Sequence, residues 1–201
     1  VFAQLGYPIS LDNYDFPEAE TLTEDITSTI GQKTGTWIGI APFAQHRSKV
    51  YPKDLMQETI DLLAAKPNTT LLLFGGGRDE AHALKKFAGE KPNIVFIAGG
   101  TLNLKQELKV ISNLDVMISM DSANGHMAAM LGKKVITLWG ATHPYLGFMP
   151  FKQPMEHQLM ASREQYPALP TSVYGNKKVA GYDDAMRTIT PQMVVGKVQE
   201  I

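Results

Sequence analysis

The sequence predicts an α/β fold in which a Rossmann-like parallel sheet carries helices on both faces. Two observations support this prediction. From Trp37 onward, short apolar runs alternate with segments of helical period, which is the pattern of a parallel sheet with crossover helices. Each run is apolar almost throughout, as expected of a strand that is covered on both faces. The five expected strands span residues 37–41, 70–74, 94–98, 116–120 and 135–139.

Helices are expected between these strands because apolar residues recur there on one helical face. The residues concerned are Leu55, Met56, Ile60 and Leu63, then Leu104, Leu108 and Ile111, then Met127, Met130 and Leu131. Thr190 followed by Pro191 is typical of a helix start, so we expect the chain to end in a helix.

Two stretches break this alternation. Residues 1–36 contain Gly and Pro around an acidic middle, and we interpret them as a linker with a peripheral strand and as the remnant of a preceding domain. Residues 140–181 contain five prolines, too many for a regular element, and a loop of that length usually lines a site or contacts a partner. Residues 37–201 then form one Rossmann-like domain, which suits a chain of 201 residues.

Composition and charge disfavour several classes of protein. The 19 Lys and Arg residues against 20 Asp and Glu give a net charge of −1, so no basic field would bind nucleic acid. Without cysteine there is no disulfide, thiolate metal site or catalytic thiol, and this composition suits a reducing compartment. No uncharged apolar run approaches the roughly 20 residues that span a bilayer. We therefore expect a cytoplasmic protein without a transmembrane segment.

Ligand chemistry is expected at the carboxyl ends of the strands, where open parallel sheets bind their ligands. After the first strand, His46, Arg47 and Lys49 form a cationic turn that could receive phosphate oxygens or could be a solvated basic turn. After the second, three glycines precede Asp79 and Glu80. These carboxylates could accept hydrogen bonds from ribose hydroxyls, or their charge could simply stabilise the N-terminus of the next helix. This pattern is not the GxGxxG dinucleotide fingerprint, so a nicotinamide or flavin enzyme is disfavoured.

The fourth strand runs directly into a helix through Asp121, Ser122 and Ala123. The first backbone amides of a helix have no intrahelical partners, so this turn is a ready anion site. His126 could support it or could be a half-buried histidine satisfied elsewhere, and Ser122 could be a plain N-cap.

Two threonines follow the neighbouring strands. Thr101 comes after the small residues that end the third strand, and Thr142, with His143, comes after the fifth. Together these turns predict a nucleoside diphosphate site without a metal or a cofactor. A nucleophile and base pair is not evident, so the catalytic residues are unknown.

Three segments resemble glycosyltransferase family 9, the ADP-heptose:lipopolysaccharide heptosyltransferases and their relatives. They are IGIAPFAQHRSKVYP, LLLFGGGRDE and ISNLDVMISMDSANGHMAAMLGKKVITLWGATHP. The resemblance covers residues 37–201. It implies a GT-B architecture of two Rossmann-like domains, of which this chain would be the C-terminal, donor-binding half.

The resemblance also implies roles for individual residues. Lys49 would meet the diphosphate or sugar, Glu80 or Asp79 the ribose, and Asp121 the transferred sugar. The amides of Ser122 and Ala123 would bind phosphate, with His126 behind them. The sequence departs from the family in two places. Ala123 replaces the usual glycine while Gly125 stands where a larger residue is common, which moves the flexible position of the loop, and Ala44-Gln45 replaces a Thr-Thr pair, which bears on the identity of the donor.

The implied reaction is transfer of a sugar from a nucleoside diphosphate sugar, ADP-linked by family default, to a lipopolysaccharide core or similar glycan. Heptose is likewise the default sugar. The base would be an Asp of the N-terminal domain, so this fragment alone is expected to be inactive, and any contact with the inner face of the membrane would involve that missing domain. Two alternatives remain open: another GT-B enzyme or a sugar-nucleotide epimerase, and a non-catalytic module that binds a nucleotide or anion.

Overall fold

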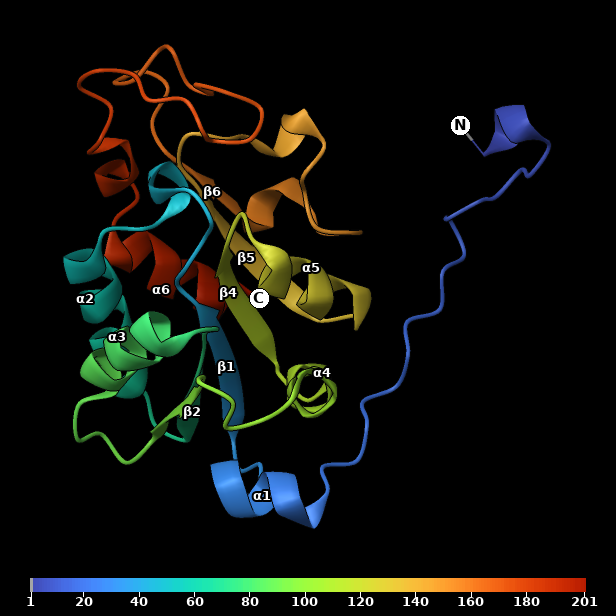
Figure 1. The fold of residues 1–201 in the computed structure, drawn as a ribbon, viewed down its shortest axis with the longest axis vertical. Helices are drawn as coiled ribbons and strands as arrows, with labels where there is room; N and C mark the ends of the chain where they lie inside the picture. Colours follow the sequence, from blue (N-terminus) through green and yellow to red (C-terminus); the bar gives the residue numbers. More distant parts are fainter. Residues whose placement is uncertain (1) are drawn as a thin grey trace.

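The computed structural model describes residues 2–201, and a six-stranded sheet lies at its centre (Figure 1). The strands are β1 (Thr36–Ala41), β2 (Thr69–Phe74), β3 (Ile94–Ile97), β4 (Val116–Met120), β5 (Lys134–Trp139) and β6 (Gln158–Met160). All neighbours pair in parallel, in the order β3-β2-β1-β4-β5-β6. This is the doubly wound order, which confirms the predicted fold class.

Helices cover both faces of the sheet. They are α1 (Glu24–Ile30), α2 (Lys53–Ala64), α3 (Arg78–Ala88), α4 (Leu104–Ser112), α5 (Ala123–Met130) and α6 (Pro191–Glu200). One core cluster joins α2, α3 and α6 to the sheet, and a second joins α1, α4 and α5 to the opposite face. Helix α6 begins as predicted, because the Thr190 side chain accepts the backbone N–H of Met193 and Pro191 occupies the first turn.

Alternate residues of each strand supply the two core clusters. In β1, Ile38 and Ile40 pack with α2 and α6, whereas Trp37 and Ala41 pack on the other side. These four residues are at most 2% exposed. Because successive side chains point to opposite faces, a strand buried on both sides must be apolar at every position. This explains why the sequence showed continuous apolar runs.

The expected peripheral strand within residues 1–36 is wrong, since this stretch forms a short 3-10 turn (Ala3–Leu5) and helix α1. Its first turn carries Glu24 and Asp25, where carboxylates favour the helix dipole. Ile26 and Ile30 are one helical turn apart and both are buried against the sheet. The four-residue spacing of these two isoleucines was therefore the signal of a helix.

The expectation that residues 140–181 hold no regular element is also wrong, because this stretch contains β6. The strand has only three residues and pairs with β5 from Thr137 to Trp139. The Trp139 indole N–H donates to Gln158 Oε1 at 2.9 Å, which fixes the two strands side by side. Residues 140–149 and 161–181 form loops and short 3-10 turns above the carboxyl end of the sheet (Figure 1). Residues 150–157 return to the amino end of β5, where the Gln153 side chain accepts the N–H of Val135 and donates to the Lys133 carbonyl.

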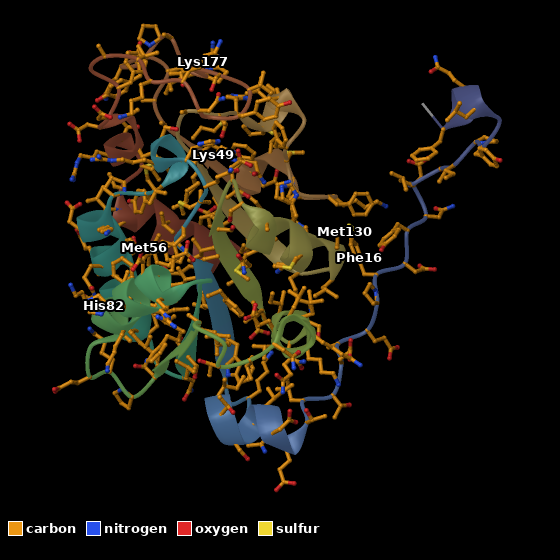
Figure 2. The ribbon with its side chains drawn as sticks, viewed as in Figure 1. Phe16, Lys49, Met56, His82, Met130 and Lys177 are labelled. Atoms are coloured by element: carbon orange, nitrogen blue, oxygen red, sulfur yellow. The ribbon has the colours of Figure 1, made fainter. Side chains whose placement is uncertain are left out.

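The N-terminal residues extend away from the domain (Figure 1). Apolar side chains are exposed along this arm, among them Phe2, Tyr7 and Ile9. The arm first contacts the domain at Asp12, whose carbonyl accepts a hydrogen bond from Lys152 Nζ at 3.0 Å, and Phe16 then packs near the end of α5 (Figure 2). None of the helices within residues 2–201 combines the length and the apolar character that crossing a membrane requires.

Candidate functional site

A cavity of about 360 Å³ lies at the carboxyl ends of β1, β2 and β4. Strands β1 and β4 are neighbours in the sheet although three α-helices and two strands separate them in sequence. The connections leave these two strands toward opposite sides, and such a switch point is where doubly wound sheets open a crevice. The turns that follow the three strands supply residues 43–45 and 49, residues 75, 76 and 80, and residues 121–124.

Lys49 and Asp121 meet in this cavity. Lys49 ends a 3-10 turn, η2 (Arg47–Lys49), and its Nζ lies 2.8 Å from Asp121 Oδ2. The same oxygen accepts the hydroxyl of Thr142 at 2.9 Å. The side chains of Lys49 and Asp121 are 13% and 4% exposed, so water screens this pair far less than a surface ion pair. The three predicted residues, each from a different turn, therefore form one cluster.

The start of helix α5 borders the same cluster. Ser122 is the N-cap in extended conformation, and its side chain makes no capping hydrogen bond. Instead its hydroxyl lies 3.1 Å from that of Ser119. The helix start is therefore not closed by its own cap, and Ala123 and Asn124 line the cavity with their small or polar groups. Free N-terminal amides with a partial positive charge favour an anion at this position.

The glycine turn after β2 forms the opposite wall. Gly75 and Gly76 line the cavity, and the Gly76 N–H donates to Glu80 Oε2 at 2.6 Å. Glu80 comes from the first turn of α3 and reaches back over the turn. A side chain at Gly75 would come within 3.1 Å of the Phe43 ring, so the turn packs tightly under the cavity.

Three other predicted residues lie outside the cavity lining. Asp79 is exposed on α3, so the structure brings Glu80 to the cavity and not its neighbour. The Thr101 hydroxyl donates to the Ala98 carbonyl at 2.6 Å beside the edge strand β3. His126 is half-buried within α5, one turn beyond the helix start.

His143 has a local structural contact. Its Nδ1 accepts the N–H of Tyr145 at 3.2 Å, so it caps the short turn η3 (Pro144–Leu146). Burial, with the Arg163 charge as a smaller cause, lowers the pKa of His143 below its usual range. It is therefore neutral at pH 7.

Sequence reasoning missed the residues that enclose Lys49. Gly175 packs on the Lys49 side chain, and the Phe148 ring centroid lies 5.9 Å from its ammonium nitrogen. Both belong to the proline-rich stretch, whose part around Lys177 lies above Lys49 in Figure 2. The only signal for such contacts was the length of that loop. No group of three or more His, Asp or Glu side chains within residues 2–201 is placed to hold a metal ion.

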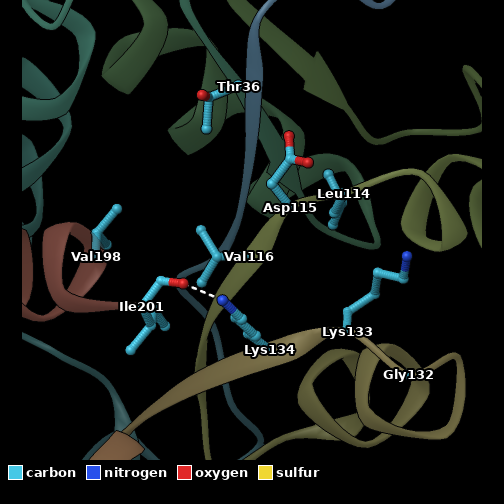
Figure 3. A pocket seen from close by; sticks show the side chains of 9 residues that line it. All are labelled: Thr36, Leu114, Asp115, Val116, Gly132, Lys133, Lys134, Val198 and Ile201. Atoms are coloured by element: carbon cyan, nitrogen blue, oxygen red, sulfur yellow. Dashed lines mark hydrogen bonds between the residues drawn. The ribbon is translucent and has the colours of Figure 1, made fainter.

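A second hollow, of about 420 Å³, lies at the amino ends of the strands (Figure 3). Two of its charged side chains, those of Asp115 and Lys134, already contact the protein. The Asp115 carboxylate accepts the N–H of Trp37 at 2.7 Å and pairs with Lys33 at 3.0 Å, and Lys134 donates to the Ile201 carbonyl. The hollow is larger, but its polar groups show none of the convergence that marks the first cavity.

A family model described as glycosyltransferase family 9 (heptosyltransferase) matches residues 1–182. The chain belongs to glycosyltransferase family 9. This result confirms the family that the sequence motifs indicated.

Individual relatives agree with the family. The chain is similar to lipooligosaccharide heptosyltransferase 2 of Haemophilus influenzae, with 27% identity over 191 residues that cover 92% of this chain and 52% of the relative. It thus spans about half the length of that protein. Two E. coli structures share the fold. Heptosyltransferase WaaC with ADP has a TM-score of 0.63 at 19% identity, and the match covers 87% of this chain and 47% of WaaC. ADP-heptose lps heptosyltransferase II has a TM-score of 0.66 at 18% identity, and the match covers 92% of this chain and 53% of that protein.

Proposed function

We propose that this chain binds the donor of a glycosyltransferase that moves a sugar from a nucleoside diphosphate sugar to a glycan acceptor. The observation that carries the proposal is the Lys49–Asp121 pair beside the open N-terminus of α5, within one cavity. ADP is the first candidate nucleotide because the E. coli WaaC structure was solved with it. Heptose, a lipopolysaccharide core acceptor and a cytoplasmic location at the inner face of the membrane extend the same proposal.

The diphosphate is assigned to the amides that begin α5 and to the Lys49 ammonium. An ammonium group has three protons, and the contact with Asp121 uses one of them. The other protons can therefore donate to phosphate oxygens. As the bond to the sugar breaks, negative charge develops on the diphosphate, and preorganised donors stabilise it. The proposal needs no cofactor besides the donor.

The transferred sugar is assigned to Asp121. Lys49 and Thr142 both contact Oδ2 of this carboxylate, and we assign the other oxygen, Oδ1, to a sugar hydroxyl. Two fixed donors on Oδ2 hold the carboxylate plane in one orientation. Glu80, on the opposite wall of the cavity, is the candidate partner of the ribose hydroxyls.

Calorimetric titration of this chain with ADP, UDP and GDP tests the proposal. We expect a preference for one base, ADP by family default. Lys49→Ala should weaken binding of that nucleotide about tenfold or more, since a hydrogen bond to a charged group contributes about 1.5–3 kcal/mol. Lys86→Ala is the matched control because this lysine is exposed in the last turn of α3. Equal affinity for all three nucleotides would support the alternative, a module that binds anions without recognising a base.

A further inference from the structure

The turn that carries Lys49 is bound to a distant loop through the end of β5. The Ala141 N–H donates to the Ser48 carbonyl at 3.1 Å, and the Ala141 carbonyl accepts the N–H of Thr171 at 2.9 Å. The Ser48 hydroxyl also donates directly to the Gly175 carbonyl. Residues 171–177, here called the 171–177 loop, thus contact the Lys49 turn both directly and through Ala141.

Within this loop, Gly175 lies against the aliphatic part of Lys49. A Cβ atom at Gly175 would lie 2.8 Å from Lys49 Cε and 2.9 Å from Lys49 Cγ. It would also lie 3.3 Å from Thr142 Cγ2. Real Cβ atoms do not approach other carbons this closely, so only glycine leaves room for the present path of the lysine. Its φ of +74° independently favours glycine.

The charged end of Lys49 is enclosed as well. Asp121 is on one side, and the Phe148 ring lies 5.9 Å from the nitrogen on another. Tyr174, the neighbour of Gly175, packs edge-on to Phe148 with ring centroids 5.9 Å apart. The loop therefore bounds the lysine along its stem through Gly175 and supports, through Tyr174, the ring beside its ammonium group.

We propose that Gly175 is a positioning residue for Lys49. A free lysine side chain populates many rotamers, and binding an anion with it requires that freedom to be lost. By confining the stem before the ligand arrives, the 171–177 loop presents the ammonium group at Asp121 in advance. The consequence for donor binding rests on the proposed function, whereas the confinement of Lys49 does not.

The confinement is tested without any nucleotide. The chain is labelled with formaldehyde and a mild reductant, and mass spectrometry follows methylation of each lysine amine over time. Gly175→Ala should displace the Lys49 stem and raise the labelling rate of Lys49 several-fold, while the rate at exposed Lys86 stays unchanged. Gly181→Ala is the matched control, because this glycine also has a positive φ, +80°, but open space around its Cα. It introduces the same kind of backbone strain and should leave Lys49 labelling unchanged.

A milder variant covers the case in which Gly175→Ala does not fold. Ser48→Ala removes only the hydroxyl that donates to the Gly175 carbonyl. It should raise Lys49 labelling in the same direction by a smaller factor. Unchanged Lys49 labelling in a folded Gly175→Ala chain, or in Ser48→Ala where the first variant is lost, would overturn the proposal.

A double-mutant cycle on ADP affinity separates positioning from a general structural role. Gly175→Ala should weaken ADP binding about tenfold in the wild-type background and have no effect when Lys49 is already alanine, since it acts through that side chain. Equal losses in the two backgrounds would contradict the proposal. If the wild-type chain binds none of the three nucleotides, the proposed function fails, and the labelling rates still decide the role of Gly175.

Discussion

Replacing Lys49 with alanine should destabilise the fold as well as the site. The substitution leaves Asp121, which is 4% exposed, with the Thr142 hydroxyl as its hydrogen-bond donor. Breaking a buried ion pair by removing one partner costs about 3–5 kcal/mol. Because the lysine end of the pair still reaches solvent at 13% exposure, we expect a loss of about 2–3 kcal/mol. For a domain of this size, that lowers the melting temperature by roughly 5–10 °C.

The control is an ion pair of similar length on the surface. Arg187 lies 2.8 Å from Asp54, with side chains that are 46% and 62% exposed. Solvent-exposed pairs of this kind contribute little to stability, so Arg187→Ala should have a small effect. Urea unfolding at pH 7, followed by circular dichroism, measures both variants. The slope with urea should stay constant, which shows that the substitutions changed stability and not the extent of unfolding.

A second substitution separates lost charge pairing from lost packing. Adding Asp121→Asn to Lys49→Ala removes the unpaired charge, and the new amide oxygen can still accept the Thr142 hydroxyl. At least half of the lost stability should return, although nucleotide binding stays weak. If Lys49→Ala is no more destabilising than Arg187→Ala, or if the second substitution recovers nothing, the pair is not held in a water-poor site and the reasoning is refuted.

Three further predictions concern single positions. Glu80→Gln should weaken ADP binding about tenfold in calorimetry by removing a charged acceptor of ribose hydroxyls, whereas exposed Asp79→Asn should not, and equal effects would refute this assignment. Gly140→Ala should lower unfolding free energy by about 1–3 kcal/mol, because its methyl group would collide with the Ser48 carbonyl. In contrast, Gly196→Ala, inside α6 with open space around it, should raise that free energy by about 0.5–1 kcal/mol in the same urea titrations. Burial lowers the pKa of His157 below its usual 6.5, so the unfolded state binds more protons and stability falls as the pH drops through 6.5. The melting temperature should therefore decline less steeply in His157→Gln than in the wild type between about pH 8 and about pH 5. An identical decline in the two proteins would contradict the lowered pKa.

The predicted strands agree with the structure because a strand that is buried on both faces is apolar at nearly every position, and this pattern is visible in the sequence. The observed strands β1, β2 and β5 begin one residue earlier than predicted, and β3 ends one residue earlier. Strand β6 has no such apolar run. Its three residues owe their conformation to the ladder with β5 and to the contact between Trp139 and Gln158, neither of which is local in sequence.

The site was predictable only where its position follows from topology. The residues after β1 and β4 had to lie at one edge, since carboxyl ends of parallel strands share an edge. It was harder to predict which side chain of a turn enters the cavity, because the first turn of α3 directs Asp79 and Glu80 to different sides. The contact of Gly175 with Lys49 depends on how a long loop folds back, and no local pattern encodes that path.

The pairing of Lys49 with Asp121 has a consequence for how the proposed site distinguishes ligands. An ammonium group beside a carboxylate has little net charge, so the pair alone attracts a diphosphate weakly. Attraction must therefore come largely from the open amides of α5, which act on any phosphate at that position. The Asp121 carboxylate instead repels a bare phosphate placed against it and accepts a hydrogen bond from a hydroxyl. On the proposed function, the amides of α5 hold the nucleotide, and Asp121, fixed by Lys49 and Thr142, distinguishes a nucleotide that carries a sugar from one that does not.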